Sequence, residues 1–149
     1  ETGVGPFFVT DYAGHFSDIT YRGEPGELSM IVALAQAGPV QIELIQPTTD
    51  HPCAYRDSVD PGTVGFHHMC VWTHDIEADT EYLTGLGYPA ANMGSAGPVR
   101  FAYYDTRPLM GCMLEVVEHL PAIAARFQRI AEVCADWDGE RPIRPSSEL

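Results

Sequence analysis

The fold is decided by residues 65–78, which read GFHHMCVWTHDIEA. Alternation over residues 67–73 divides the side chains between two faces, with His68, Cys70 and Trp72 on one and Met69, Val71 and Thr73 on the other. Asp75 then occupies the position of a helix N-cap, and Gly87 is suited to end the helix. This stretch therefore predicts a strand over 67–73 and a helix over 75–86.

The second half of the chain continues as a series of turns and strands. Two turns rich in Gly or Pro and two strands follow the helix, with the turns at 94–98 and 107–111 and the strands at 99–105 and 112–118. A helix followed by about three strands gives residues 65–118 the order βαβββ.

The first half repeats the end of this pattern. It contains strand-like segments at residues 5–11, 27–35 and 40–47, but no opening strand and helix. The segment QIELI at 41–45 resembles MLEVV at 113–117, which indicates an internal repeat of roughly 50 residues. We therefore predict an α+β fold with an incomplete first module, a linker, a second module, and a C-terminal helix with a tail, at residues 1–47, 48–64, 65–118 and 119–149.

The C-terminal region divides further. Apolar residues recur at helical spacing over 120–133, so we expect a helix that packs on the outside of the sheet. Residues 136–149 hold two prolines and several charges, and this composition predicts an extended or partly disordered arm.

Composition excludes several classes of partner. The chain has 149 residues, enough for one core, and a formal net charge of -13 that repels nucleic acid and anionic membranes. A local site could still attract an anion through Arg22, Arg56 or Arg100. The four cysteines form no C-x-x-C pair, and no apolar run approaches the roughly 18 residues of a membrane span. We expect a soluble protein of a reducing compartment, the cytoplasm.

Each closing strand carries a carboxylate at its middle, Glu43 in the first half and Glu115 in the second. A buried carboxylate without a partner costs several kcal/mol. Either both residues therefore face solvent, or they share an internal site with His68. Because neighbouring residues of a strand point to opposite faces, only one of His67 and His68 can enter that site. Imidazole beside carboxylate oxygens suits a first-row divalent metal better than calcium or magnesium.

The stretch at 65–78 resembles the second-module opening of methylmalonyl-CoA epimerases and related glyoxalase-like proteins of the vicinal oxygen chelate superfamily. The segments at 3–8 and 137–142 are also similar to members of this branch. The resemblance implies two βαβββ-type modules that form a cup-shaped mixed sheet with helices outside. It also implies a divalent ion of Zn, Co, Ni, Mn or Fe, held by His68, Glu43 and Glu115, with Glu115 and Glu43 as catalytic residues. The cup face would add a substrate pocket formed by Trp72, Phe101, Tyr103, Met113 and Cys70, although these residues could equally be core.

The function implied by the resemblance is an isomerase, epimerase or lyase that acts on a small carbonyl or acyl-CoA substrate through an enediolate-type intermediate. Alternatives in the same superfamily are a ring-cleaving dioxygenase and a non-enzymatic protein that binds an aromatic or drug-like molecule. The resemblance also implies a homodimer. The family's opening strand carries a further His ligand, and that strand is missing from this sequence. We expect the strand upstream. Alternatively, a second subunit completes the site, or the protein binds metal weakly or not at all.

Overall fold

The computed structural model describes residues 3–149 and confirms the predicted α+β class. The chain divides into two compact units. The first comprises the described residues up to Ala13 together with Met30–Thr48 and Leu120–Leu149, and the second comprises Gly14–Ser29 and Thr49–His119. Each unit is built around one sheet, with the strand order β10-β1-β4-β5 in the first and β3-β2-β7-β8-β9-β6 in the second. None of the helices formed by residues 3–149 is long and apolar enough to cross a membrane.

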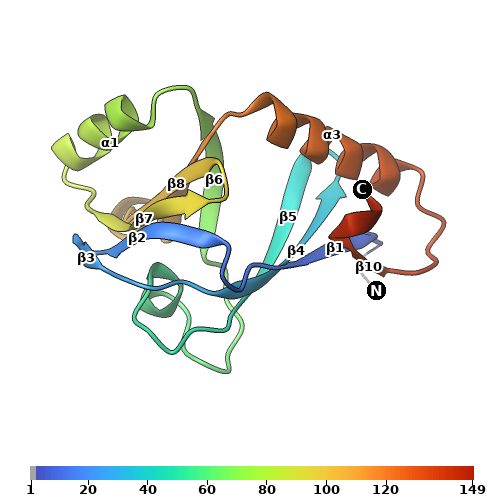
Figure 1. Ribbon diagram of the computed structural model, residues 1–149, viewed down its shortest axis with the longest axis horizontal. Coiled ribbons are helices and arrows are strands. Elements are labelled where there is room, and N and C mark those ends of the chain that lie inside the picture. Colours follow the sequence, from blue (N-terminus) through green and yellow to red (C-terminus); the bar gives the residue numbers. More distant parts are fainter. Residues whose placement is uncertain (1–2) are drawn as a thin grey trace. The chain divides into compact units, whose positions relative to one another are not determined.

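The second unit contains the predicted βαβββ order (Figure 1). Its elements are β6 (His68–Thr73), α1 (Ile76–Gly85), β7 (Ala90–Ala96), β8 (Val99–Tyr104), a short helix α2 (Arg107–Met110) and β9 (Met113–Glu118). The strands β7, β8 and β9 are antiparallel neighbours, whereas β6 runs parallel to β9 at the edge of the sheet. This parallel pairing returns the first strand of the module beside the last.

Helix α1 packs on one face of this sheet. The helix begins as predicted, because the Asp75 side chain accepts a hydrogen bond of 3.0 Å from the Ala78 N–H. Ile76 of the helix joins a buried cluster formed with Ala102, Tyr104 and Val116. Alternation along β8 and β9 then directs Tyr103 and Glu115 to the opposite face, which α1 does not cover.

Two strands of the second unit come from the first half of the chain, and the sequence did not predict them. They are β2 (Phe16–Tyr21), which pairs antiparallel with β7, and β3 (Glu24–Pro25). Asp18 adopts a positive φ of 55°, and the β2–β7 register shifts between Ser17 and Thr20. This irregularity interrupts the alternation of polar and apolar side chains by which a strand is recognised.

The predicted linker at 48–64 also differs from expectation. It contains a short 3-10 helix, η1 (Ala54–Asp57). Cys53, Ala54 and Tyr55 are at most 5% exposed, so this segment belongs to the core of the second unit.

The first unit is an antiparallel meander covered by a helix. β1 (Phe7–Asp11), β4 (Met30–Ala37) and β5 (Val40–Pro47) pair in turn, and α3 (Pro121–Ala135) packs on β4. Ile130 of α3 is fully buried. β5 is the outer strand of this sheet.

The C-terminal tail is more regular than its composition predicts. β10 (Ile143–Pro145) pairs parallel with β1 and is followed by η2 (Ser146–Glu148). Arg141 and Glu148 form an ion pair of 2.7 Å. The Trp137 ring lies so close to Gly5 that a Cβ there would approach it to 2.8 Å, so Gly5 is needed for this contact.

Candidate metal centre

Parallel pairing of β6 with β9 brings a histidine and a glutamate together. In the register of the two strands, His68 lies opposite Met113 and Cys70 lies opposite Glu115. His68 and Glu115 are thus diagonal neighbours on the face that α1 leaves uncovered. The His68 Nε2 atom lies 3.4 Å from Glu115 Oε2, and the two side chains are 8% and 11% exposed. The nitrogen and the oxygen therefore face each other with little access to water.

The separation of these two atoms fits a pair of metal ligands better than a tight ion pair. A hydrogen bond between a charged nitrogen donor and a carboxylate is typically about 2.7–2.9 Å long. Two ligand atoms that are each about 2.1 Å from a tetrahedral ion lie about 3.4 Å apart. Imidazole and carboxylate are also ligands that first-row divalent metals accept. His68 and Glu115 therefore fit the divalent ion that the sequence predicts.

Glu43, the third predicted ligand, lies at the middle of β5, opposite Leu34 of β4. Its position on this outer strand is exposed. β5 belongs to the first unit, whereas His68 and Glu115 belong to the second. That Glu43 reaches the His68–Glu115 pair stays a prediction.

The five predicted pocket residues differ in their access to solvent. Phe101, Tyr103 and Met113 are at most 6% exposed, whereas Trp72 is 40% exposed and Cys70 is also exposed. The Tyr103 ring centroid lies 5.2 Å from that of His68 and 5.9 Å from that of Phe101. Tyr103 therefore gives the histidine an aromatic neighbour, and Phe101 packs against the Tyr103 ring. Of the five, Trp72 and Cys70 are the side chains that a ligand can reach without displacing the core.

His67 is closer to the site than the sequence predicts. The alternation rule places it on the opposite face, but β6 begins at His68, so the rule does not govern His67. Its Nδ1 lies 3.0 Å from His68 Nδ1, and its Nε2 lies 3.0 Å from the Ala54 carbonyl oxygen. Burial against the Tyr55 and Tyr103 rings lowers the pKa of His67 to about 4.

The η1 segment that holds Ala54 is tied to the sheet by buried polar contacts. Asn92 of β7, which is 1% exposed, accepts a hydrogen bond of 2.5 Å from the Ala54 N–H and donates one of 2.8 Å to the Thr20 carbonyl. The hydroxyls of Tyr55 and Tyr103 are 2.7 Å apart. These contacts fix the backbone carbonyl that His67 faces.

An ion cluster holds the other end of η1. The Asp57 carboxylate accepts hydrogen bonds of 2.7 Å from Arg22 and from the Tyr21 hydroxyl. Asp105, at the end of β8, pairs with Arg107 at 2.7 Å and with Arg22 at 3.0 Å. Hydrogen bonds from Arg107 and Arg22 hold the pKa of Asp105 well below its usual range.

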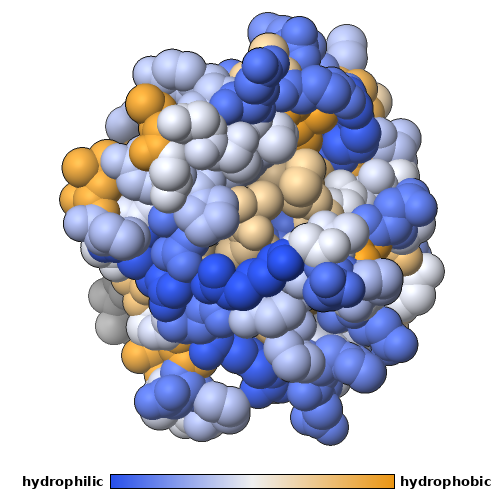
Figure 2. Space-filling view, turned by 90° about the vertical axis from the view of Figure 1, so that its left-hand side faces the viewer, coloured by the Kyte–Doolittle hydropathy of each residue, from blue (hydrophilic) through white to orange (hydrophobic). Residues whose placement is uncertain are grey.

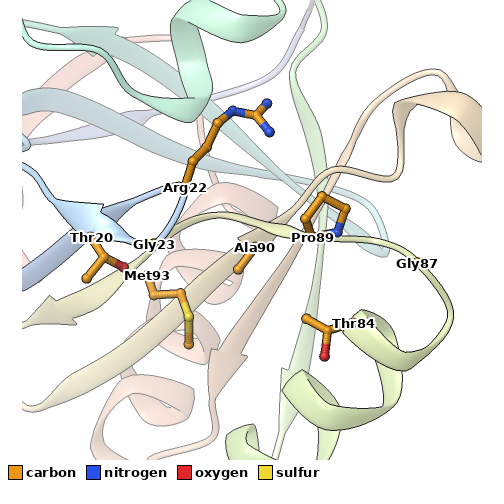
Figure 3. A pocket seen from close by; sticks show the side chains of 8 residues that line it. All are labelled: Thr20, Arg22, Gly23, Thr84, Gly87, Pro89, Ala90 and Met93. Atoms are coloured by element: carbon orange, nitrogen blue, oxygen red, sulfur yellow. The ribbon is translucent and has the colours of Figure 1, made fainter.

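A separate hollow of about 500 Å³ lies on the second unit, away from this pair (Figure 3). It is lined by Thr20, Arg22, Gly23, Thr84, Gly87, Pro89, Ala90 and Met93. Figure 2 shows this side of the molecule, where weakly hydrophobic residues form a floor surrounded by hydrophilic ones. In Figure 3 the Arg22 guanidinium points away from Thr84, toward η1. Because Ala90 and Met93 pack against the cluster beneath α1, this hollow lies on the helix side of the sheet and is not the predicted pocket.

Comparison with known proteins identifies the family. Residues 7–103 match the model of the Glyoxalase/Bleomycin resistance protein/Dioxygenase superfamily. The match covers more than half of the chain, so the protein belongs to this superfamily, as the stretch at 65–78 predicted. The superfamily includes epimerases, glyoxalases and dioxygenases, and membership alone does not select one activity.

One solved structure similar to this chain is that of methylmalonyl-CoA epimerase from Mycobacterium tuberculosis. The two sequences are 20% identical, and the alignment covers 72% of this chain and 75% of the epimerase with a TM-score of 0.42. These values are too low to indicate a shared activity. A search of curated proteins finds no match.

Proposed function

We propose that the protein is a metal-dependent enzyme of the glyoxalase-like type, an isomerase, epimerase or lyase that acts on a small carbonyl compound. The observation that carries this proposal is the enclosed pair of His68 Nε2 and Glu115 Oε2, 3.4 Å apart on neighbouring strands. Family membership supports it, because the superfamily includes enzymes of these types.

In this proposal, His68 and Glu115 hold a divalent ion, and Glu43 of the first unit is a third ligand or the catalytic base. The ion would supply Lewis acidity toward the carbonyl oxygen of the substrate. One carboxylate removes the proton from the neighbouring carbon and can return it, which is the general-base step common to isomerases and epimerases. Because one carboxylate cannot easily bind the ion and accept this proton at the same time, the glutamate that acts as the base does not hold the ion at that step.

The charges of the second unit favour an uncharged carbonyl substrate over an acyl-CoA, which carries several phosphate charges. The sequence contains no lysine, and each of the unit's four arginines already contacts an acidic side chain. Their partners are Asp57 and Asp105 for Arg22, Asp50 for Arg56, Glu77 and Glu118 for Arg100, and Asp105 for Arg107. The anion-binding role of Arg22, Arg56 and Arg100 is therefore disfavoured.

The first test is metal analysis of protein purified without chelator. We expect one divalent ion per chain. The enzyme is then incubated in D2O with small α-hydroxy and α-keto carbonyl compounds, and exchange of the C–H beside the carbonyl is followed by NMR. We expect Glu115→Gln to slow this exchange by about 100-fold or more.

Glu118→Gln is the matched control, because it makes the same change of charge on β9 but on the face that pairs with Arg100. It should keep both the ion and the exchange activity. A metal-free protein that exchanges no proton and still binds aromatic ligands would overturn the enzyme and support the binding-protein alternative.

A further inference from the structure

A chain of hydrogen bonds runs from the centre of the second unit to His68. It begins at Asn92, passes through the backbone of Ala54 to His67, and ends at His68 Nδ1. Because several of these groups can act only as donors or only as acceptors, the chain determines where the protons lie.

The first links fix the orientation of each group. Asn92 donates from Nδ2 to the Thr20 carbonyl, so its Oδ1 is the atom that accepts from the Ala54 N–H. The Ala54 carbonyl oxygen can only accept, and it lies 3.0 Å from His67 Nε2. His67 therefore carries a proton on Nε2.

The hydrogen bond between the two histidines determines which ring nitrogen of His68 carries a proton. With Nε2 protonated, a neutral His67 presents a lone pair at Nδ1. A second proton would create a cation at a residue that is 9% exposed and whose ring nitrogens face a carbonyl oxygen and another imidazole. The bond of 3.0 Å between the two Nδ1 atoms is then donated by His68.

We propose that His67 is a positioning residue that holds His68 in the tautomer with its proton on Nδ1. As a neutral imidazole, His68 then has its lone pair on Nε2, the atom that faces Glu115 Oε2 at 3.4 Å. In the other tautomer, Nε2–H would donate to Glu115 and would have to lose its proton before binding a cation. Two atoms with lone pairs facing each other form a site ready for a cation.

The assignment of the tautomer follows from the hydrogen bonds, whereas its role in holding an ion rests on the proposed function. The direct test is long-range 1H–15N NMR of the metal-free protein labelled at histidine nitrogens, at neutral pH. We expect His67 to show a protonated Nε2 and His68 a protonated Nδ1 with a nonprotonated Nε2. A protonated Nε2 on His68 would overturn the assignment.

Variants test the role of His67. His67→Phe keeps a planar ring but removes the acceptor for His68 Nδ1, so we expect the tautomer of His68 to shift and the affinity for Zn²⁺ to fall by about 10–100-fold. His74→Phe is the control, because it replaces a histidine beyond the end of β6 that is not in the chain of hydrogen bonds, and it should change neither quantity. Unchanged tautomer and affinity in folded His67→Phe would overturn the positioning role.

The two proposals can fail separately. A wild-type protein that binds one ion tightly but has Nε2 of His68 protonated when metal-free would overturn this inference and leave the proposed function standing. A protein with the expected tautomer but no affinity for Zn²⁺, Co²⁺, Ni²⁺, Mn²⁺ or Fe²⁺ would support the tautomer and overturn its link to a cation.

Discussion

The closing strands β5 and β9 have similar sequences and different surroundings. Both carry a glutamate at the middle of an apolar run, QIELI at 41–45 and MLEVV at 113–117. β9 lies between β8 and β6, whereas β5 is the outer strand of its sheet. As a result Glu115 is 8% exposed, but the position of Glu43 is exposed.

A repeated motif thus identifies a candidate residue, while the neighbouring strand determines which side chains surround it. β6 places the His68 imidazole beside Glu115, whose side chain is 11% exposed. Within residues 3–149, β5 pairs with β4 alone, so its own sheet flanks Glu43 with a strand on one side only. The two carboxylates should therefore contribute unequally to any shared site.

The largest expected effect concerns metal affinity. We expect Glu115→Ala to weaken Zn²⁺ binding by about 100-fold or more, because an enclosed ligand is not easily replaced by water. Glu43→Ala should weaken it by only about tenfold, since water can take the place of a carboxylate at an exposed position. Isothermal titration of both variants measures the difference. Equal losses of affinity would contradict this prediction and show that Glu43 is as enclosed as Glu115 in the metal-bound protein.

A smaller effect is expected on stability. Val116 of β9 is 1% exposed and packs beneath α1, so Val116→Ala should lower the free energy of unfolding by about 1–3 kcal/mol. Leu44 of β5 is 54% exposed, and Leu44→Ala should change it by less than about 0.5 kcal/mol although it removes more atoms. Urea denaturation measures both values. A larger loss for Leu44→Ala would mean that β5 is covered in solution by a surface outside the described residues.

The sequence predicts those parts of the fold in which local signals agree with the tertiary environment. β6, α1 and β9 lie within one or two residues of expectation, because the alternation and the Asp75 cap both operate locally. β2 is missed because of its irregularity at Asp18. β10 is missed because three residues that end in Pro145 form a strand only through their pairing with β1. In both cases a distant partner, rather than composition, determines the structure.

In the candidate site, too, some contacts follow from local sequence signals and others depend on distant segments of the chain. The face shared by His68 and Cys70 can be read from period-two alternation, and the structure brings His68 to Glu115. The contact from His67 cannot be predicted in this way, because it depends on η1 delivering the Ala54 carbonyl. A buried 3-10 turn within a polar, Pro- and Gly-containing segment leaves no periodic signal in the sequence.

The smallest expected effect concerns the stability contributed by ion pairs, which should differ between an enclosed and an exposed carboxylate. The Asp105 side chain is 13% exposed and holds Arg22 and Arg107, whereas Glu132 in the Arg129 pair of α3 is 53% exposed. Asp105→Asn should lower the free energy of unfolding by about 1 kcal/mol at pH 7, and Glu132→Gln should lower it by less than about 0.5 kcal/mol.

The contribution of Asp105 to stability should also depend on pH. Because the arginines lower the pKa of Asp105 in the folded state below its usual 3.8, this contribution is present above that pH and is lost as the pH falls further. The stability difference between wild type and Asp105→Asn, measured by urea denaturation, should therefore shrink below about pH 3.8. If the stability difference between wild type and Asp105→Asn stayed constant in strong acid, packing rather than charge would account for the contribution of Asp105.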